Sequence, residues 1–91
     1  MQAQYQFKYL VDAPLKSRVG ASGIVYRCKV KLDRFTRYTI VIYHNDNETK
    51  LSIYENLTIL IDRVEAGTLH QALITADKHI AHCVSLKETS T

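Results

Sequence analysis

Hydrophobic and polar residues alternate through much of the first half of the chain, which is typical of β-strands with one buried face. The clearest run spans residues 24–32. Its apolar side would consist of Ile24, Tyr26, Cys28, Val30 and Leu32. Its other side would consist of Val25, Arg27, Lys29 and Lys31. The pattern therefore predicts a strand with a wet, basic face.

Two more strands are predicted beside it. Residues 5–11 alternate, with Tyr5, Phe7, Tyr9 and Val11 on one face. Residues 37–44 form a β-branched and aromatic run that suits a strand. Residues 12–23 contain Pro14 and two of the three glycines, which predicts a long connection. Short turns at 33–36 and 45–48 favour antiparallel neighbours, so we expect a meander.

The second half of the chain changes to a helical period. Ser52 and Glu55 match a capping box. Apolar residues follow at helical spacing: Ile53, Leu57, Leu60, Ile61 and Val64. Gly67 stands where a helix often ends in a left-handed residue. These features predict a main helix over residues 52–66.

The last third of the chain is ambiguous between helix and strand. Thr68 and Gln71 repeat the capping pattern, and we expect a short helix over residues 69–77. Residues 79–87 also alternate, which favours a last strand. The predicted fold class is α+β, with a three- to four-stranded antiparallel sheet packed on one main helix and a short second helix. With 91 residues, the chain is expected to form a single small globular domain, 1–91.

The apolar runs are only four or five residues long, far short of the ~20 that a membrane span needs. The first residues contain neither a basic region nor an apolar one, so we expect no signal peptide and no membrane association. Two cysteines, Cys28 and Cys83, are too few for a disulfide framework and are expected to be reduced thiols. These observations favour a cytoplasmic protein. No motif implies a cofactor.

The charge is distributed unevenly along the chain. The net charge is +3. Residues up to 44 carry eight basic and two acidic side chains, and the remainder carries four basic and seven acidic ones. The first part is therefore at +6 and the second at −3. We expect the strands of the first half to form a basic surface.

The strand period sharpens this expectation. Arg27, Lys29 and Lys31 recur every second residue, so they would stand about 6.5–7 Å apart on one face, which matches the spacing of phosphates along a nucleic-acid strand. Further candidates around this row are Arg34, Arg37, Lys8 and Thr39, with Tyr43 as a possible stacking surface. The pattern favours a regulatory or binding module, without enzymatic activity, that contacts a nucleic-acid backbone.

Other interpretations of the basic face remain open. A sheet with one wet face carries polar residues there in any case, and lysines on strands also discourage aggregation. The same surface suits a protein-interaction module that binds an acidic protein partner as an adapter or inhibitor. A short chain also gains stability by oligomerising, so a homodimer paired through the exposed third strand is a further hypothesis.

Three local constellations suggest chemistry only weakly. His79, His82 and Cys83 have a spacing that could bind zinc on a helix, but a structural site needs four ligands, so no metal site is predicted. Gly20 and Gly23 frame a loop that could hold a phosphate, although a hairpin turn is the simpler interpretation. No acid–base pair or nucleophile motif is present, so we expect no catalytic residues.

Overall fold

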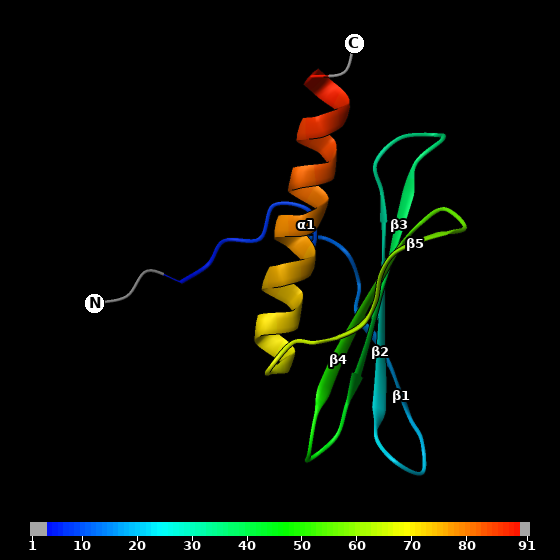
Figure 1. Cartoon of the computed structure of the whole chain (residues 1–91), viewed down its shortest axis with the longest axis vertical. Coiled ribbons are helices and arrows are strands. Elements are labelled where there is room, and N and C mark those ends of the chain that lie inside the picture. The colour runs from blue at the N-terminus through cyan, green and yellow to red at the C-terminus, as the bar shows by residue number, and fades with distance from the viewer. Residues whose placement is uncertain (1–3, 90–91) are drawn as a thin grey trace.

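The computed structural model describes residues 4–89, so the ends of the predicted domain, residues 1–3 and 90–91, lie outside the described residues. The elements are β1 (Lys16–Val19), β2 (Ile24–Lys31), β3 (Arg37–His44), β4 (Thr49–Glu55), β5 (Thr58–Glu65) and α1 (Leu69–Thr89). The strands form one antiparallel sheet in the order β1-β2-β3-β4-β5. Figure 1 shows α1 lying along one face of this sheet. The α+β class and the antiparallel meander are therefore confirmed. The sheet has five strands, however, and not the predicted three to four, and residues 4–89 contain one helix in place of a main helix and a short second one.

The strands at 24–32 and 37–44 are confirmed almost residue for residue. In the register of β2 and β3, Cys28 faces Ile40 and Lys29 faces Thr39. The intervening turn is fixed by Asp33, whose carboxylate accepts hydrogen bonds from the amides of Phe35 and Thr36 at 2.8 Å each. The strict alternation of β2 thus separates a buried side from a basic one.

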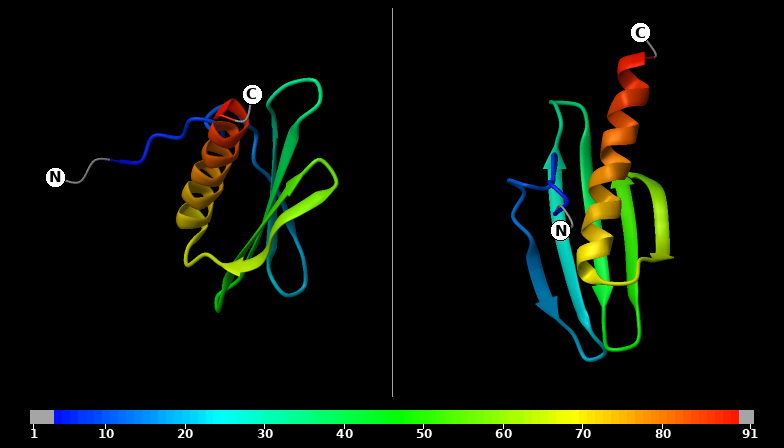
Figure 2. Two further views of the ribbon diagram at one scale, coloured as in Figure 1. Left: turned by 45° about the horizontal axis from the view of Figure 1, so that its top comes forward. Right: turned by 90° about the vertical axis from the view of Figure 1, so that its left-hand side faces the viewer.

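The core lies between the sheet and α1, which packs against β3 and β4 (Figure 2). Its fully buried large side chains are Tyr38, Ile40, Ile42, Leu51, Ile53 and Ile80. Ala72 and Ala76 are also buried on the helix, and these small side chains let α1 approach the strands closely. We call this side of the sheet the covered face and the opposite side the open face.

The predicted helix over residues 52–66 is wrong, because this segment forms the hairpin of β4 and β5. Asn56 adopts a left-handed backbone with φ of 53° in the two-residue loop, a conformation that Asn accepts more readily than most residues. Its side chain accepts a hydrogen bond from the Arg37 amide at 3.0 Å and donates to the Phe35 carbonyl at 3.0 Å. The loop is thereby tied to the start of β3 and to the turn that precedes it.

Two β-bulges explain why β5 has a helical spacing of apolar residues. Ile53 faces Ile61 and Leu51 faces Val64, so β5 uses three residues where β4 uses two. A second bulge lies between the pairs Ile53–Ile61 and Tyr54–Ile59. Each bulge adds one residue and changes the period of the strand locally. The three-residue step from Ile61 to Val64 is therefore an interrupted strand alternation, whereas Ile53 belongs to β4 and Leu57 to the exposed loop.

The second capping box is confirmed, but the element after it is longer than predicted. The Gln71 amide donates to the Thr68 hydroxyl at 3.1 Å, and the Thr68 amide donates to the Gln71 side chain at 3.2 Å. The helix runs on to Thr89, so the strand predicted at 79–87 is wrong. Lys87 holds the far end of α1 to the sheet through an ion pair of 2.7 Å with Glu55.

The strand predicted at residues 5–11 is also wrong. This segment lies beside α1 and is hydrogen bonded to Asp77, and it forms no strand of the sheet. The carboxylate of Asp77, which is 1% exposed, accepts hydrogen bonds from the Tyr5 hydroxyl at 2.6 Å and the Tyr9 amide at 2.7 Å. The amides of Lys8 and Leu10 also donate to it, at 3.1 and 3.0 Å. Asp77 therefore clamps the N-terminal segment beside the helix.

The order of the strands excludes a dimer that pairs through the third strand. The third strand of the chain, β3, lies between β2 and β4, and both its edges are hydrogen bonded. It cannot pair with a second copy. The edges of the sheet are β1, which is short, and β5, which is bulged, and both features are known to protect edges from pairing. No helix within residues 4–89 has the length and apolar character needed to cross a membrane.

Candidate nucleic-acid interface

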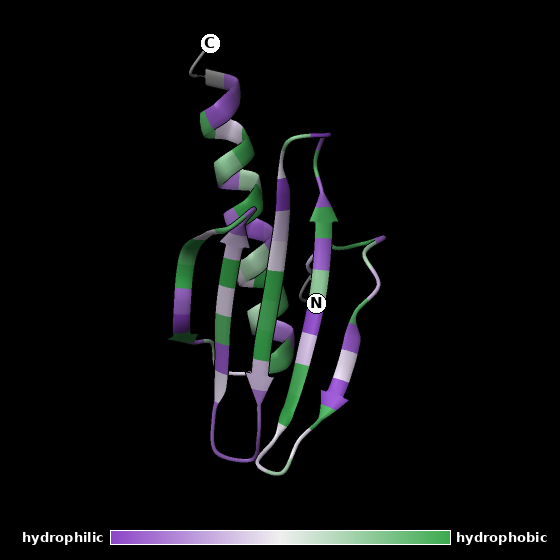
Figure 3. Cartoon of the chain, turned by 90° about the vertical axis from the view of Figure 1, so that its right-hand side faces the viewer, coloured by the Kyte–Doolittle hydropathy of each residue, from purple (hydrophilic) through white to green (hydrophobic). Residues whose placement is uncertain are grey.

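The three basic residues of β2 lie on the open face. Arg27, Lys29 and Lys31 are exposed, while the intervening Cys28 and Val30 are buried on the other side. Figure 3 views the sheet from this side, with α1 behind the strands. Within residues 4–89, none of the three is in an ion pair, and the chain does not cover them. Their charges therefore face solvent as the strand period predicts.

Neighbouring strands extend the row in two directions. Directly opposite residues of antiparallel strands share a face, so Lys16 joins Arg27, Arg18 joins Val25, and Arg37 joins Lys31. Sequence reasoning placed Lys16 and Arg18 in a connection, because Pro14 and the glycines outweighed the short alternation of β1. We call the resulting set the cationic strip: Lys16, Arg18, Arg27, Lys29, Lys31 and Arg37.

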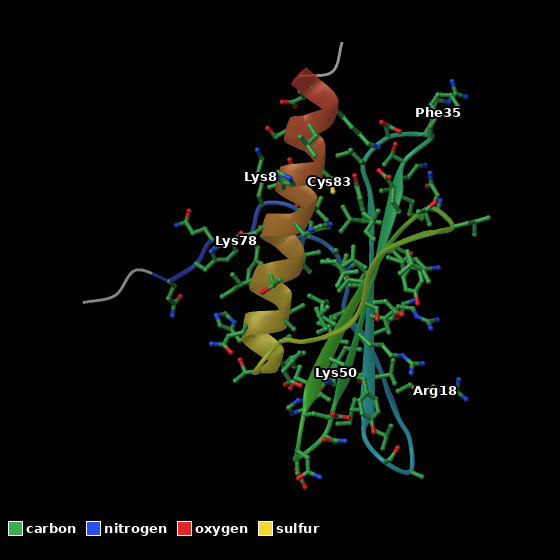
Figure 4. The ribbon with its side chains drawn as sticks, viewed as in Figure 1. Lys8, Arg18, Phe35, Lys50, Lys78 and Cys83 are labelled. Carbon is green, nitrogen blue, oxygen red and sulfur yellow. The ribbon has the colours of Figure 1, made fainter. Side chains whose placement is uncertain are left out.

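Arg34 lies at the end of the cationic strip, in the turn between β2 and β3. Its guanidinium stands 5.6 Å from the centre of the Phe35 ring, and Phe35 itself is 80% exposed. Figure 4 shows Phe35 projecting from this end of the molecule. Arg34 therefore extends the positive surface beyond the strands, as expected.

Lys8 does not belong to this surface. It lies in the N-terminal segment that Asp77 clamps, and its ammonium group stands 5.4 Å from the Tyr9 ring centre. Figure 4 places Lys8 on the helix side, whereas Arg18 projects from the opposite side of the sheet. The expectation that Lys8 flanks the row fails because residues 5–11 do not join the sheet.

Tyr43 lies on the open face, opposite Val25 and Lys50. Its hydroxyl donates to the Ser22 carbonyl at 2.7 Å and accepts from the Asn45 side chain at 3.2 Å. A Cβ on Gly23 would stand 3.0 Å from the Tyr43 ring and 2.7 Å from the His44 carbonyl oxygen. Gly23 thus permits the hairpin loop to approach the ring of Tyr43. The Gly20 amide donates to the Gly23 carbonyl at 2.8 Å, so this loop is a hairpin turn between β1 and β2.

A concavity of about 540 Å³ lies beside the cationic strip on β3, β4 and β5. Its lining includes Val25, Val41, Tyr43, Ser52, Tyr54 and Arg63. We call it the aromatic concavity. Tyr54, Ser52 and Arg63 were missed by sequence reasoning because they fell within the predicted helix over 52–66. The alternation of Lys50, Ser52 and Tyr54 against Leu51 and Ile53 was the signal that could have found them.

Charges near the aromatic concavity are balanced, in contrast to the cationic strip. The ammonium group of Lys50 stands 3.1 Å from Glu65 and 3.9 Å from Glu48. Its hydrogen bond to Glu65 lowers the pKa of that carboxyl below its usual value, against the opposing effect of desolvation. The open face therefore has a positive side on β1–β3 and a nearly neutral, aromatic side on β3–β5.

The residues considered for metal binding are not brought together into a site. His79, His82 and Cys83 lie along α1, but no group of three or more His, Cys, Asp or Glu side chains is arranged to bind a metal in residues 4–89. Burial raises the pKa of both thiols, Cys28 and Cys83, so neither is poised as a thiolate nucleophile.

Comparisons with protein-family models, with curated proteins and with solved structures give no match to this chain. A function must therefore be inferred from the residues of the open face.

Proposed function

We propose that this chain is a binding module without catalytic activity whose cationic strip contacts the phosphate backbone of a nucleic acid. The observation that carries the proposal is the row of exposed charges at Arg27, Lys29 and Lys31, which in the described part of the chain are in no ion pair and lie on a face that no helix covers. Arg18 and Lys16 widen the row on one side, and Arg37 and Arg34 extend it at one end.

The geometry of β2 supports a repeating anion as the ligand. Same-face side chains along a strand repeat about every 6.5–7 Å, and successive phosphates of a nucleic-acid strand repeat at a similar interval. Long basic side chains adapt to small differences between the two spacings. An acidic protein surface lacks such regular spacing, so the strip suits it less well.

The distribution of charge supports a directed surface rather than general basicity. Glu65 of β5 and Glu48, in the turn before β4, pair with Lys50 at the far side of the open face. Their negative charges are thus held away from β2. A polyanion would meet the cationic strip without first displacing internal ion pairs, which would otherwise weaken the interaction.

Fluorescence anisotropy with a labelled oligonucleotide of mixed sequence tests the proposal, using a double variant Arg27→Gln and Lys29→Gln. The matched control is Lys8→Gln with Lys78→Gln, which removes the same charge from the helix side (Figure 4). We expect the first variant to reduce the slope of log affinity against log salt by about 1.4 for a single strand. The control should leave it nearly unchanged.

Two results would contradict this function. Equal losses in the two variants would mean that net charge alone governs binding. Affinity for polyglutamate equal to that for the oligonucleotide would favour an acidic protein partner instead.

A further inference from the structure

We propose that the aromatic concavity holds one unpaired base of a single-stranded nucleic acid whose backbone lies on the cationic strip, so that the module prefers single strands to duplexes. This inference rests on the proposed function, and it adds the class of nucleic acid and the second half of the site.

The position of Tyr54 connects the two halves of the open face. Lys29 on β2 faces Thr39 on β3, which faces Tyr54 on β4, so the three lie in one row across the sheet. Two strand spacings separate Lys29 from Tyr54, about 10 Å. A nucleotide with its phosphate at Lys29 would therefore direct its base toward the ring of Tyr54.

The lining of the aromatic concavity has the composition that a base requires. Val41 supplies an apolar floor, and the aromatic rings of Tyr54 and Tyr43 supply surfaces for stacking. Ser52 and Arg63 add a hydroxyl and a guanidinium that can bond to polar groups at the edge of a base. Since Lys50 is held by two glutamates, Arg63 is the main basic group that the concavity offers to a ligand.

The backbone of Arg63 is an independent indication of a binding role. Arg63 has a φ of 52°, an unfavourable conformation for a residue with a side chain, and it lies in the bulge opposite Ser52. Its amide donates to the Ser52 hydroxyl at 3.0 Å, which fixes the bulge. Bulges redirect side chains next to binding sites, and strained residues concentrate there. The bulge in this way directs the Arg63 side chain toward the aromatic concavity.

Tyr43 forms a wall that is ordered before a ligand arrives. Its hydroxyl is bonded to Ser22 and Asn45, and its ring lies against the backbone of Gly23. A side chain that is already fixed loses little conformational entropy on binding. The aromatic concavity is thus partly pre-formed.

Duplex nucleic acid cannot use this site in the same way. Its phosphates can lie on the cationic strip, but its bases are paired and stacked, and extruding one requires that its pairing and stacking be broken. Single strands present their bases without that cost. The two halves of the open face therefore make different predictions for the two kinds of ligand.

The test compares a labelled single strand with a hairpin duplex of matched length and charge whose loop is a linker without bases, using fluorescence anisotropy with Tyr54→Ala and Tyr54→Phe. We expect the wild type to bind the single strand more tightly. Tyr54→Ala should weaken single-strand binding about 5- to 150-fold, the effect of losing one stacked base, and leave the hairpin nearly unchanged. Tyr54→Phe keeps the ring and should retain most of the affinity.

Arg63→Gly separates binding from folding. Glycine adopts a positive φ readily, so this variant should unfold at the same temperature as the wild type or a higher one. It should nevertheless bind the single strand more weakly, because the guanidinium is lost. Thermal unfolding and anisotropy on the same sample measure both effects.

Failure of this inference is distinguishable from failure of the proposed function. Equal affinity for single strand and hairpin, or unchanged single-strand binding by Tyr54→Ala, would overturn the base site while salt-dependent binding through Arg27 and Lys29 still held. No salt-dependent binding to either ligand would overturn both proposals.

Discussion

The covered face and the open face are built from alternate residues of the same strands, yet they meet opposite physical demands. On β3, Ile40 is fully buried against the helix side, while its neighbour Val41 lines the aromatic concavity. On β2, Cys28 is buried and Lys29 is exposed. Stability is therefore concentrated on one side of the sheet, and the other side can carry charge and curvature at little cost to folding.

The covered face is also the more elaborate of the two. α1 covers β3 and β4, and the N-terminal segment fills the space beside the helix, with Phe7, Leu10, Cys28 and Leu73 around one small cavity of about 80 Å³. Asp77 joins these two covering elements. Among the residues that the structure describes, the open face has no second layer, so its properties follow from the strands.

Truncation of a core residue should change the free energy of unfolding more than any other substitution proposed below, and it tests the contrast between the two faces. Ile40→Ala is expected to lower the free energy of unfolding by about 2–5 kcal/mol, because it leaves a cavity among fully buried side chains. Val41→Ala, the matched change on the open face, should cost clearly less. Chemical denaturation of both variants measures the difference. Equal losses would mean that the two faces contribute alike to stability.

The clamp at Asp77 should give the next largest effect. Asp77→Asn replaces a charged acceptor of four hydrogen bonds and is expected to cost about 2–4 kcal/mol in the free energy of unfolding. Asp46→Asn, at an exposed turn, is the control and should be nearly neutral. If both variants unfold alike, the N-terminal segment contributes little to the covered face.

The same clamp predicts a dependence on pH. Burial alone would raise the pKa of Asp77, but the hydrogen bonds from the Tyr5 hydroxyl and the three amides outweigh it and lower the pKa. A pKa lowered by folding stabilises the protein above the unfolded value of about 3.9, and this stabilisation is lost as the pH falls through the folded value. Denaturation curves between neutral and acidic pH should show this loss in the wild type and less of it in Asp77→Asn.

A smaller effect is expected where the sheet connects to the helix. Gly67 has a φ of 82°, and a Cβ there would also collide with the Gln71 side chain of the capping box. Gly67→Ala should therefore cost about 1–2 kcal/mol. Gly20→Ala is the control, since a Cβ there meets only an ordinary contact of 3.5 Å. Equal decreases in the unfolding temperature of both variants would contradict a special role for Gly67.

The smallest effect on stability should come from the cationic strip. Arg27→Gln with Lys29→Gln removes exposed charges that form no ion pair with any residue from 4 to 89, so the free energy of unfolding should change by no more than about 0.5 kcal/mol. A slight gain would also fit, because like charges lie close together there. A large loss, measured by chemical denaturation, would show that this row has a structural role.

Much of the fold could be predicted where one period runs without interruption. β2 alternates strictly and β3 is a β-branched and aromatic run, and each ends at a polar turn, so the bounds of both strands and the facing of β2 could be predicted from the sequence. The capping box at Thr68 and Gln71 was also correct. Burial and local hydrogen bonds act together at these positions.

The errors arose where two patterns compete. Ser52 and Glu55 match a capping box as well as Thr68 and Gln71 do, but the left-handed Asn56 and the bulges of β5 favour a hairpin. Bulges depend on the partner strand, which local spacing does not specify. Residues 5–11 alternate like a strand, but they pair with Asp77, about 70 positions away in the chain. For this reason Lys8 was misplaced, and Tyr54 and Arg63 were missed.

The late position of α1 in the chain has a consequence for biosynthesis. All five strands precede it, so the apolar side of the sheet can be shielded only after the residues of α1 have been synthesised and have left the ribosome. A sheet that formed earlier would expose Ile40, Ile42 and Ile53 to solvent. Apolar surface exposed in this way during folding favours aggregation.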